Sequence, residues 1–228
     1  SYNEIEDQLK DEGLFLGFNY DMAGNFLNLL GSENRDNRNT FIGQEYAHYI
    51  KADLDLRYHL NLDGSKQKLV SRVFAGIGQP LGTTKTMPFV KQYFSGGPYS
   101  VRAFRIRSLG PGTYSPEDGS NSFFDQSGDI KLEANLEYRF PITEYVNGAV
   151  FGDAGNVWLT NENEALPGGK FSSDFIDEIG AGVGFGLRVD IQSFVLRLDL
   201  ATPVKEPSSS WNLDTSSPVL NFAIGYPF

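Results

Sequence analysis

The sequence predicts an all-β protein whose strands form an antiparallel transmembrane β-barrel. The first observation is a strict two-residue alternation over 50–62, where apolar residues alternate with charged and polar ones. Because successive side chains of a strand point to opposite faces, this segment has one apolar face and one charged face. The second observation is length. The alternating runs approach or exceed the roughly 9 to 11 residues that a tilted strand needs to cross a bilayer, whereas strands of soluble proteins average about 5 to 6.

The alternation over 50–62 defines the two faces of the predicted barrel wall. The apolar face carries Ile50, Ala52, Leu54, Leu56, Tyr58, Leu60 and Leu62, and the polar face carries Lys51, Asp53, Asp55, Arg57, His59 and Asn61. The same pattern returns over 130–140 and over 194–200. We expect the apolar faces to contact lipid and the polar faces to line a wet lumen.

Turn residues and long polar segments divide the chain into about eight strand regions. In order, these regions span 13–30, 45–62, 66–80, 128–142, 146–158, 177–191, 193–205 and 219–228. Tight turns at 63–65 and 141–144 alternate with long polar segments at 31–40, 81–128, 159–174 and 206–218. Bacterial outer-membrane barrels have short periplasmic turns and long external loops, so the long segments are expected on one side of the membrane.

The strand region 177–191 carries glycines at every second position. Gly180, Gly182, Gly184 and Gly186 share one face, and the apolar residues between them share the other. Glycine weakens a strand interior, so four on one face indicate that another part of the chain packs closely against them. A phosphate-binding loop would need a strand-to-helix turn here, but this run continues as strand.

The last predicted strand ends in alternating aromatic residues. Phe222, Ile224, Tyr226 and Phe228 are expected to point outward, and Ala223, Gly225 and Pro227 inward. Because proline cannot donate a ladder hydrogen bond, Pro227 belongs at an edge or at a frayed strand end.

Composition excludes several classes of protein. The 228 residues include no cysteine, which removes disulfides and thiolate metal sites, and the net charge of -10 argues against nucleic-acid binding. His48 and His59 form no metal-ligand pattern, and the sequence contains no Gly-x-Ser-x-Gly nucleophile motif. We therefore expect a protein that is not an enzyme and that has neither a metal nor a cofactor.

The longest polar segment carries three ordered motifs. Gly96-Gly97 is followed by Val101-Arg102-Ala103-Phe104 and then by Leu109-Gly110-Pro111. This order and spacing resemble the inward-folded loop of the bacterial surface antigen family, the BamA and TamA superfamily of outer-membrane protein insertases and translocases. Segments 128–140, 151–158 and 222–228 resemble later strands of the same family, the last being its C-terminal recognition strand.

The resemblance implies a single partial barrel domain over 1–228. Family barrels have about sixteen strands, so this chain would supply about eight C-terminal strands, with the loop at about 81–128 folded into the lumen. One residue departs from the family pattern, since Ala103 stands where the family has glycine. If that position requires a positive φ, alanine there would be strained.

Arg102 is the candidate centre of the site. A guanidinium inside a lumen needs carboxylate partners that fit its fork geometry. The alternation turns Glu137 inward, and the family motif implies that Asp153 also faces inward. We expect Arg102 to pair with one or both and to fasten the loop, in space left by the glycines at 180–186. The alternative is an arginine exposed to solvent.

The resemblance implies a function at the bacterial outer membrane. The barrel would insert or export client outer-membrane or secreted polypeptides through a lateral seam at the C-terminal strand, in contact with outer-membrane lipid and accessory lipoproteins. One alternative is a complete eight-stranded barrel that acts as adhesin, anchor or pore. Another is a membrane lipase or acyltransferase. Two copies of the fragment could also close their open edges as a homodimer.

Overall fold

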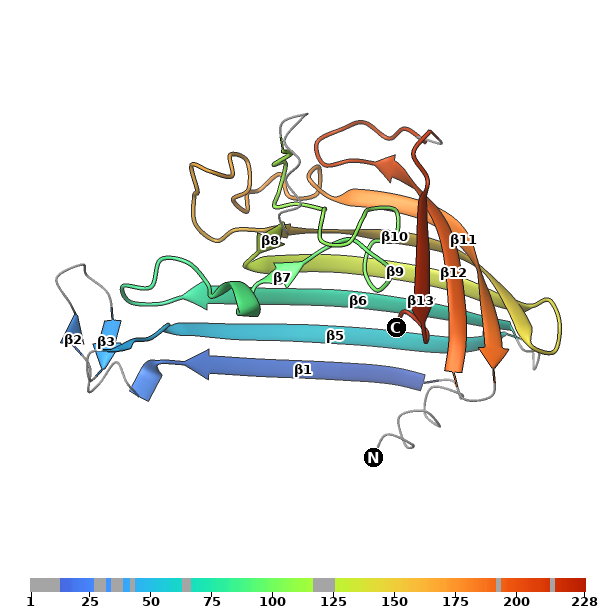
Figure 1. The fold of residues 1–228 in the computed structure, drawn as a ribbon, viewed down its shortest axis with the longest axis horizontal. Coiled ribbons are helices and arrows are strands. Elements are labelled where there is room, and N and C mark those ends of the chain that lie inside the picture. Colours follow the sequence, from blue (N-terminus) through green and yellow to red (C-terminus); the bar gives the residue numbers. More distant parts are fainter. Residues whose placement is uncertain are drawn as a thin grey trace.

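The computed structural model describes residues 13–26, 32–33, 39–41, 44–62, 67–116, 126–191, 194–213 and 216–228. Its main element is one antiparallel sheet of eight strands (Figure 1). In their order across the sheet, the strands are β1 (Gly13–Ala23), β5 (Tyr49–Leu62), β6 (Gln67–Pro80), β9 (Ile130–Pro141), β10 (Val146–Trp158), β11 (Gly180–Ile191), β12 (Phe194–Lys205) and β13 (Val219–Ile224). The predicted all-β antiparallel fold is confirmed.

Smaller elements lie in the connections between these strands. β2 (Ser32–Glu33), β3 (Asn39–Phe41) and β4 (Gln44–Glu45) form a three-stranded sheet. The segment between β6 and β9 contains a 3-10 helix, η1 (Phe89–Lys91), and the paired strands β7 (Tyr93–Phe94) and β8 (Ser127–Gly128). In the described part of the chain, no helix is long and apolar enough to span a membrane.

Several strand ends differ from the predicted ends, and two glycines explain the largest differences. β1 ends at Ala23 because Gly24 has a φ of 80°, and β13 ends at Ile224 because Gly225 has a φ of 85°. A left-handed residue turns the chain out of the extended conformation. The predicted tight turn at 63–65 lies outside the described residues.

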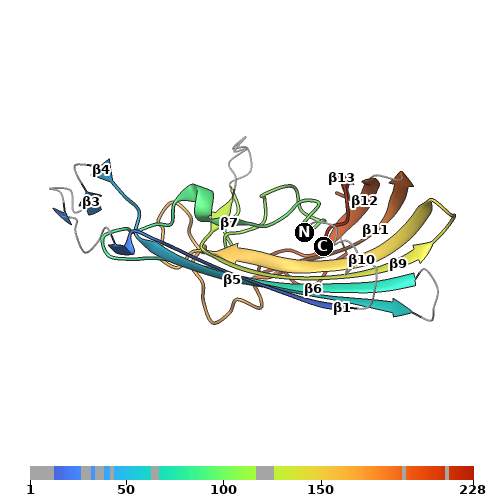
Figure 2. The same cartoon turned by 90° about the horizontal axis from the view of Figure 1, so that it is seen from below.

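The two faces of the sheet differ in chemistry as the alternation predicts. The buried side chains of β9 are Glu133, Asn135, Glu137 and Arg139. Leu136, on the opposite face, is 50% exposed. Figure 2 shows the sheet as a curved layer, and the connection between β6 and β9 lies on its concave side. The polar face is therefore the inner face, and the loop covers it.

The sheet is open. Its strands follow one another as a meander, and among the described residues no strand pairs with the outer edge of β1 or of β13. The connections at 81–129, 159–179 and 206–218 leave the same end of the sheet, because strands alternate in direction. This architecture is a partial barrel wall, as expected for half of a larger barrel.

Candidate functional site

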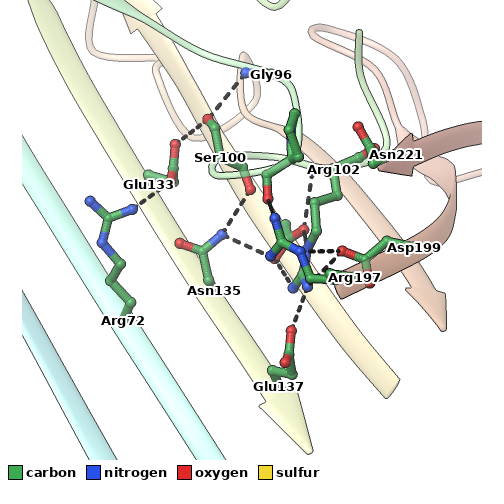
Figure 3. A network of polar contacts seen from close by, with 12 residues as sticks. Arg72, Gly96, Ser100, Arg102, Glu133, Asn135, Glu137, Arg197, Asp199 and Asn221 are labelled. Carbon is green, nitrogen blue, oxygen red and sulfur yellow. Dashed lines mark hydrogen bonds and ion pairs between the residues drawn. The ribbon is translucent and has the colours of Figure 1, made fainter. Parts of the chain in front are cut away.

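Arg102 lies at the centre of a buried network between the loop and the inner wall (Figure 3). Its Nε donates to Asp153 Oδ2 at 2.7 Å and its Nη2 to Asp153 Oδ1 at 2.9 Å, which is a bidentate contact. Nη1 donates to Glu137 Oε2. Side-chain exposure is 0% for Arg102 and Glu137 and 1% for Asp153. The structure thus brings together the three residues that the sequence pointed to, one from the loop and two from neighbouring strands.

Other inward side chains balance the charge of Glu137. Glu137 also accepts from Arg139 Nε at 2.7 Å and from Arg188 Nη2 at 2.9 Å, and Arg188 Nη1 donates to Asp199 Oδ1 at 2.5 Å. Buried carboxylates are costly unless they are paired and hydrogen-bonded. Arginines of the wall therefore pair with Glu137 and Asp199, and Arg102 of the loop supplies the guanidinium for Asp153.

The backbone of Arg102 and the flat face of its guanidinium make further contacts. The Arg102 N–H donates to Asp153 Oδ2 at 3.1 Å, and its carbonyl accepts from Asn221 Nδ2 at 2.9 Å. The guanidinium carbon lies 3.4 Å from the ring centroid of Phe151, a cation–π contact. Burial by itself lowers the pKa of Arg102, but the hydrogen bonds and charges of Asp153 and Glu137 outweigh it, so the pKa lies above its ordinary value. The residue is permanently charged.

Two glycines shape the turn that presents Arg102. Gly96 and Gly97 have φ values of 95° and 98°, and the Gly97 N–H donates to the Phe104 carbonyl at 2.9 Å. A Cβ on Gly96 would lie 2.3 Å from the Arg105 carbonyl oxygen. These positions therefore require glycine, both for conformation and for space.

Ser100 and Asn135 add a second attachment beside Arg102. The Ser100 hydroxyl donates to Glu133 Oε2 at 2.5 Å. Asn135 Nδ2 donates both to the Ser100 carbonyl at 3.1 Å and to Asp153 Oδ1 at 3.0 Å. Neither Ser100 in the loop nor Asn135 on the wall was predicted from the sequence to take part in this attachment. For Asn135, the signal was its inward position in the alternation of β9.

Ala103 occupies its position without backbone strain. Among the non-glycine residues that the structure describes, only Arg107 and Ser208 have a positive φ, so the strain considered for Ala103 does not occur. Ala103 is 2% exposed and packs with Phe151 and Ala201. Val101, also buried, completes the tip of the loop.

The glycines of β11 face inward, but only two of them lie against the loop. A Cβ on Gly182 would lie 2.1 Å from Ala103 Cβ, and one on Gly180 would lie 3.1 Å from Phe104 Cζ. Gly184 and Gly186 are covered by side chains of the sheet itself, which are Phe151 at Gly184 and Arg188 with Asp199 at Gly186. Loop residues therefore lie against the first half of the run, and inward strand residues fill the second half.

The C-terminal strand follows its predicted alternation up to Ile224. Phe222 is 63% exposed and Ile224 is 57% exposed, both on the outer face. The prediction that Phe228 points outward is wrong, because Phe228 is 6% exposed and its ring centroid lies 5.8 Å from the Arg102 guanidinium carbon. Gly225 turns the last residues inward, and Tyr226 lies against Arg139 with 4.3 Å between ring centroid and guanidinium carbon.

The chemistry of this arrangement is attachment. Each carboxylate of the network faces at least one guanidinium, so none is placed as a free general base. The described residues contain no group of three or more His, Cys, Asp or Glu side chains that could hold a metal ion. What the geometry provides is a loop fixed to the inner wall next to an open-edged terminal strand.

Comparisons with known proteins converge on one family. Residues 2–228 match the family model described as the Omp85 superfamily domain. The outer membrane protein assembly factor BamA of Neisseria meningitidis serogroup B is 33% identical over 88 residues, which cover 36% of this chain and 11% of that protein. The crystal structure of BamA from Haemophilus ducreyi lacking POTRA domains 1-3 superposes with a TM-score of 0.57 at 18% identity, over 93% of this chain and 51% of that chain. The chain therefore spans about half the length of that solved structure.

Proposed function

The chain belongs to the Omp85 superfamily, and we propose that it is the seam-bearing half of an outer-membrane barrel that inserts or exports polypeptides. Proteins of this family are outer-membrane β-barrels, and the fold described above is part of such a barrel. The observation that carries the proposal is the combination of an open terminal strand with a latched loop beside it. The latch is defined here as Arg102, Glu137 and Asp153.

The outer face of the sheet supports placement in a lipid bilayer. Large apolar side chains are exposed along successive strands, namely Leu54, Tyr58, Val73, Ile77, Leu136, Val150, Val183, Phe185, Leu187, Leu198, Leu220 and Phe222. So much contiguous apolar surface is costly in water and favourable against hydrocarbon. The outward apolar band and the inward charged face fit a barrel wall between lipid and lumen.

The edge of β13 supports a seam that accepts client strands. β13 has six residues, whereas its neighbour β12 has twelve, and no strand in the described part of the chain pairs with its outer edge. An exposed strand edge offers unpaired N–H and C=O groups, to which an extended polypeptide can add by strand augmentation. The client we propose is therefore an extended segment of an unfolded outer-membrane or secreted protein.

The latch supports a barrel whose lumen is occupied when no client is present. Arg102 anchors the loop to two adjacent strands, and Asn221 of β13 bonds the carbonyl of the same residue. The loop thus holds the inner wall together immediately beside the seam. Within the complete protein, accessory lipoproteins would act on this barrel from the periplasmic side.

The open sheet favours this proposal over a small closed barrel. An eight-stranded adhesin, anchor or pore would need its first and last strands to pair, and β1 and β13 do not pair in the described part of the chain. We also propose that the barrel acts without enzymatic chemistry, because guanidinium groups neutralise the buried carboxylates of the network.

Depletion of the full-length protein in its own cells tests this function. Newly made outer-membrane barrels would be pulse-labelled and followed as they become resistant to heat and to protease. We expect their assembly to slow as the protein is depleted and to recover with an unaltered copy, but not with a copy that carries Phe222→Pro. Normal assembly during depletion, with loss only of adherence or of solute leakage, would instead support the small-barrel function.

A further inference from the structure

The side chain of Tyr99 links the tip of the loop to the terminal strand. Tyr99 lies three residues before Arg102 and is 49% exposed. Its hydroxyl donates to the backbone carbonyl of Ile224, the last residue of β13, at 2.6 Å. This contact joins a side chain of the loop to a main-chain acceptor of the strand that borders the open edge.

The Ile224 carbonyl points toward the open edge and away from β12. The Gly225 N–H donates to the Val195 carbonyl at 2.7 Å, and Ile224 is paired in register with Leu196. In an antiparallel ladder, residues alternate between those that bond the neighbouring strand and those whose N–H and C=O point away from it. Since Gly225 bonds β12, the N–H and C=O of Ile224 face the side where a further strand would pair.

The position of Tyr99 is fixed by its own neighbours. Arg197 Nη2 donates to the Pro98 carbonyl at 2.5 Å, and the Arg197 guanidinium carbon lies 5.0 Å from the Tyr99 ring centroid. Arg197 is fully buried, and its Nε lies 3.3 Å from Asp199 Oδ2. The buried Arg197 side chain therefore holds the Tyr99 ring next to the edge of β13.

We propose that Tyr99 caps the free edge of the terminal strand, so that a polypeptide strand adding at β13 must first displace its hydroxyl from the Ile224 carbonyl. This inference rests on the proposed function, because it concerns the same seam, and it adds a residue that controls access to that seam. The cap removes one of the acceptors that an incoming strand would use, and it keeps β13 from pairing with unsuitable strands. Its loss exposes that acceptor while leaving the latch in place.

A Tyr99→Phe variant of the full-length protein in nanodiscs tests the cap. Phenylalanine keeps the ring but removes the hydroxyl, and Tyr145→Phe, in the exposed turn between β9 and β10, is the matched control. Residues 1–228 contain no cysteine, so Phe222→Cys can report strand addition by disulfide formation with a synthetic peptide. The peptide would have the sequence of residues 219–228 with one added cysteine. Hydrogen exchange of the Gly225 amide reports strand opening without peptide.

We expect Tyr99→Phe to raise both the disulfide-formation rate and the Gly225 exchange rate by roughly two- to tenfold, as for the loss of one hydrogen bond, and Tyr145→Phe to change neither. Equal disulfide rates in Tyr99→Phe and the parent would overturn the cap and leave the proposed function intact. Slower peptide addition in Tyr99→Phe would also overturn it. Failure of the peptide to add in every variant would overturn both the cap and the seam.

Discussion

Asn221 of the terminal strand donates its side-chain amide to the backbone carbonyl of Arg102 at 2.9 Å. The residue that fastens the loop is thus bonded directly to the strand at the open edge. Both side chains lie inside the curved sheet, and Phe228 approaches the same guanidinium from the end of the chain. The loop and the terminal strand therefore form one connected structure.

Removal of the Arg102 guanidinium should destabilise the barrel strongly. In Arg102→Ala, Asp153 stays buried without its guanidinium partner, while Glu137 keeps Arg139 and Arg188, and the unpaired Asp153 costs about 3 to 5 kcal/mol in the free energy of unfolding. Arg102→Lys keeps the charge but loses the fork, so it should lie between the parent and the alanine variant. Urea unfolding of the full-length protein in detergent measures the free energy of unfolding of each variant. Arg105→Ala, in an exposed part of the same loop, is the control and should change stability little.

Gly182→Ala should push the tip of the loop off the wall. The new Cβ would lie 2.1 Å from Ala103 Cβ, a distance that no packing tolerates. Gly152→Ala is the matched control, because its Cβ would approach only the Gly182 carbonyl oxygen, at 3.9 Å. Limited proteolysis should cut the loop faster in Gly182→Ala alone, and adding Ala103→Gly should restore part of the protection. Equal cleavage of both single variants would show that the loop does not pack there.

A charged residue on the outer face should lower the stability of the folded barrel strongly only in the middle of the wall. Phe185 is 62% exposed near the centre of β11, so Phe185→Arg should destabilise the folded barrel in lipid by about 2 to 4 kcal/mol. Tyr145→Arg, in the turn between β9 and β10, should cost about 0 to 1 kcal/mol. Folding titrations into liposomes compare the two variants. Similar costs would mean that Phe185 does not contact hydrocarbon.

Proline substitutions should have different effects at the two edges of β13. The alternation that begins at Gly225 directs the N–H of Ala223 toward β12 and the N–H of Phe222 toward the open edge. Phe222→Pro should therefore leave stability nearly unchanged and impair client assembly, with Phe222→Ala as a control for the lost side chain. Ala223→Pro should destabilise the sheet, because it removes a ladder hydrogen bond. A Phe222→Pro variant less stable than Ala223→Pro would contradict these directions of the two N–H groups.

Much of the wall could be predicted from the sequence, because a strand has a period of two and one face meets lipid. Phe228 could not be predicted in this way, since the positive φ of Gly225 ends the alternation before it. The contacts of Ser100 with Glu133 and of Asn221 with Arg102 were not predicted, for another reason. These contacts join residues far apart in the chain, and a polar side chain on an inward face does not by itself identify its partner.

The glycines of β11 show the same limit of prediction from local sequence. Its spacing predicted close packing on one face of β11, and the loop supplies this at Gly180 and Gly182. At Gly184 and Gly186 the space is taken by Phe151 and Arg188, which are residues of the wall. Whether a loop or a side chain fills such a space depends on the curvature of the sheet, which local sequence does not reveal.

Photo-crosslinking from the edge of the terminal strand tests the seam most directly. A photoreactive residue would replace Phe222 on β13 in the full-length protein, and another would replace Phe185 on the outer face of β11, both in cells that are synthesising outer-membrane barrels. We predict that the probe at 222 captures the terminal strand of an assembling client and that the probe at 185 captures none. Equal capture at both positions, or capture at 185 alone, would contradict client addition at β13.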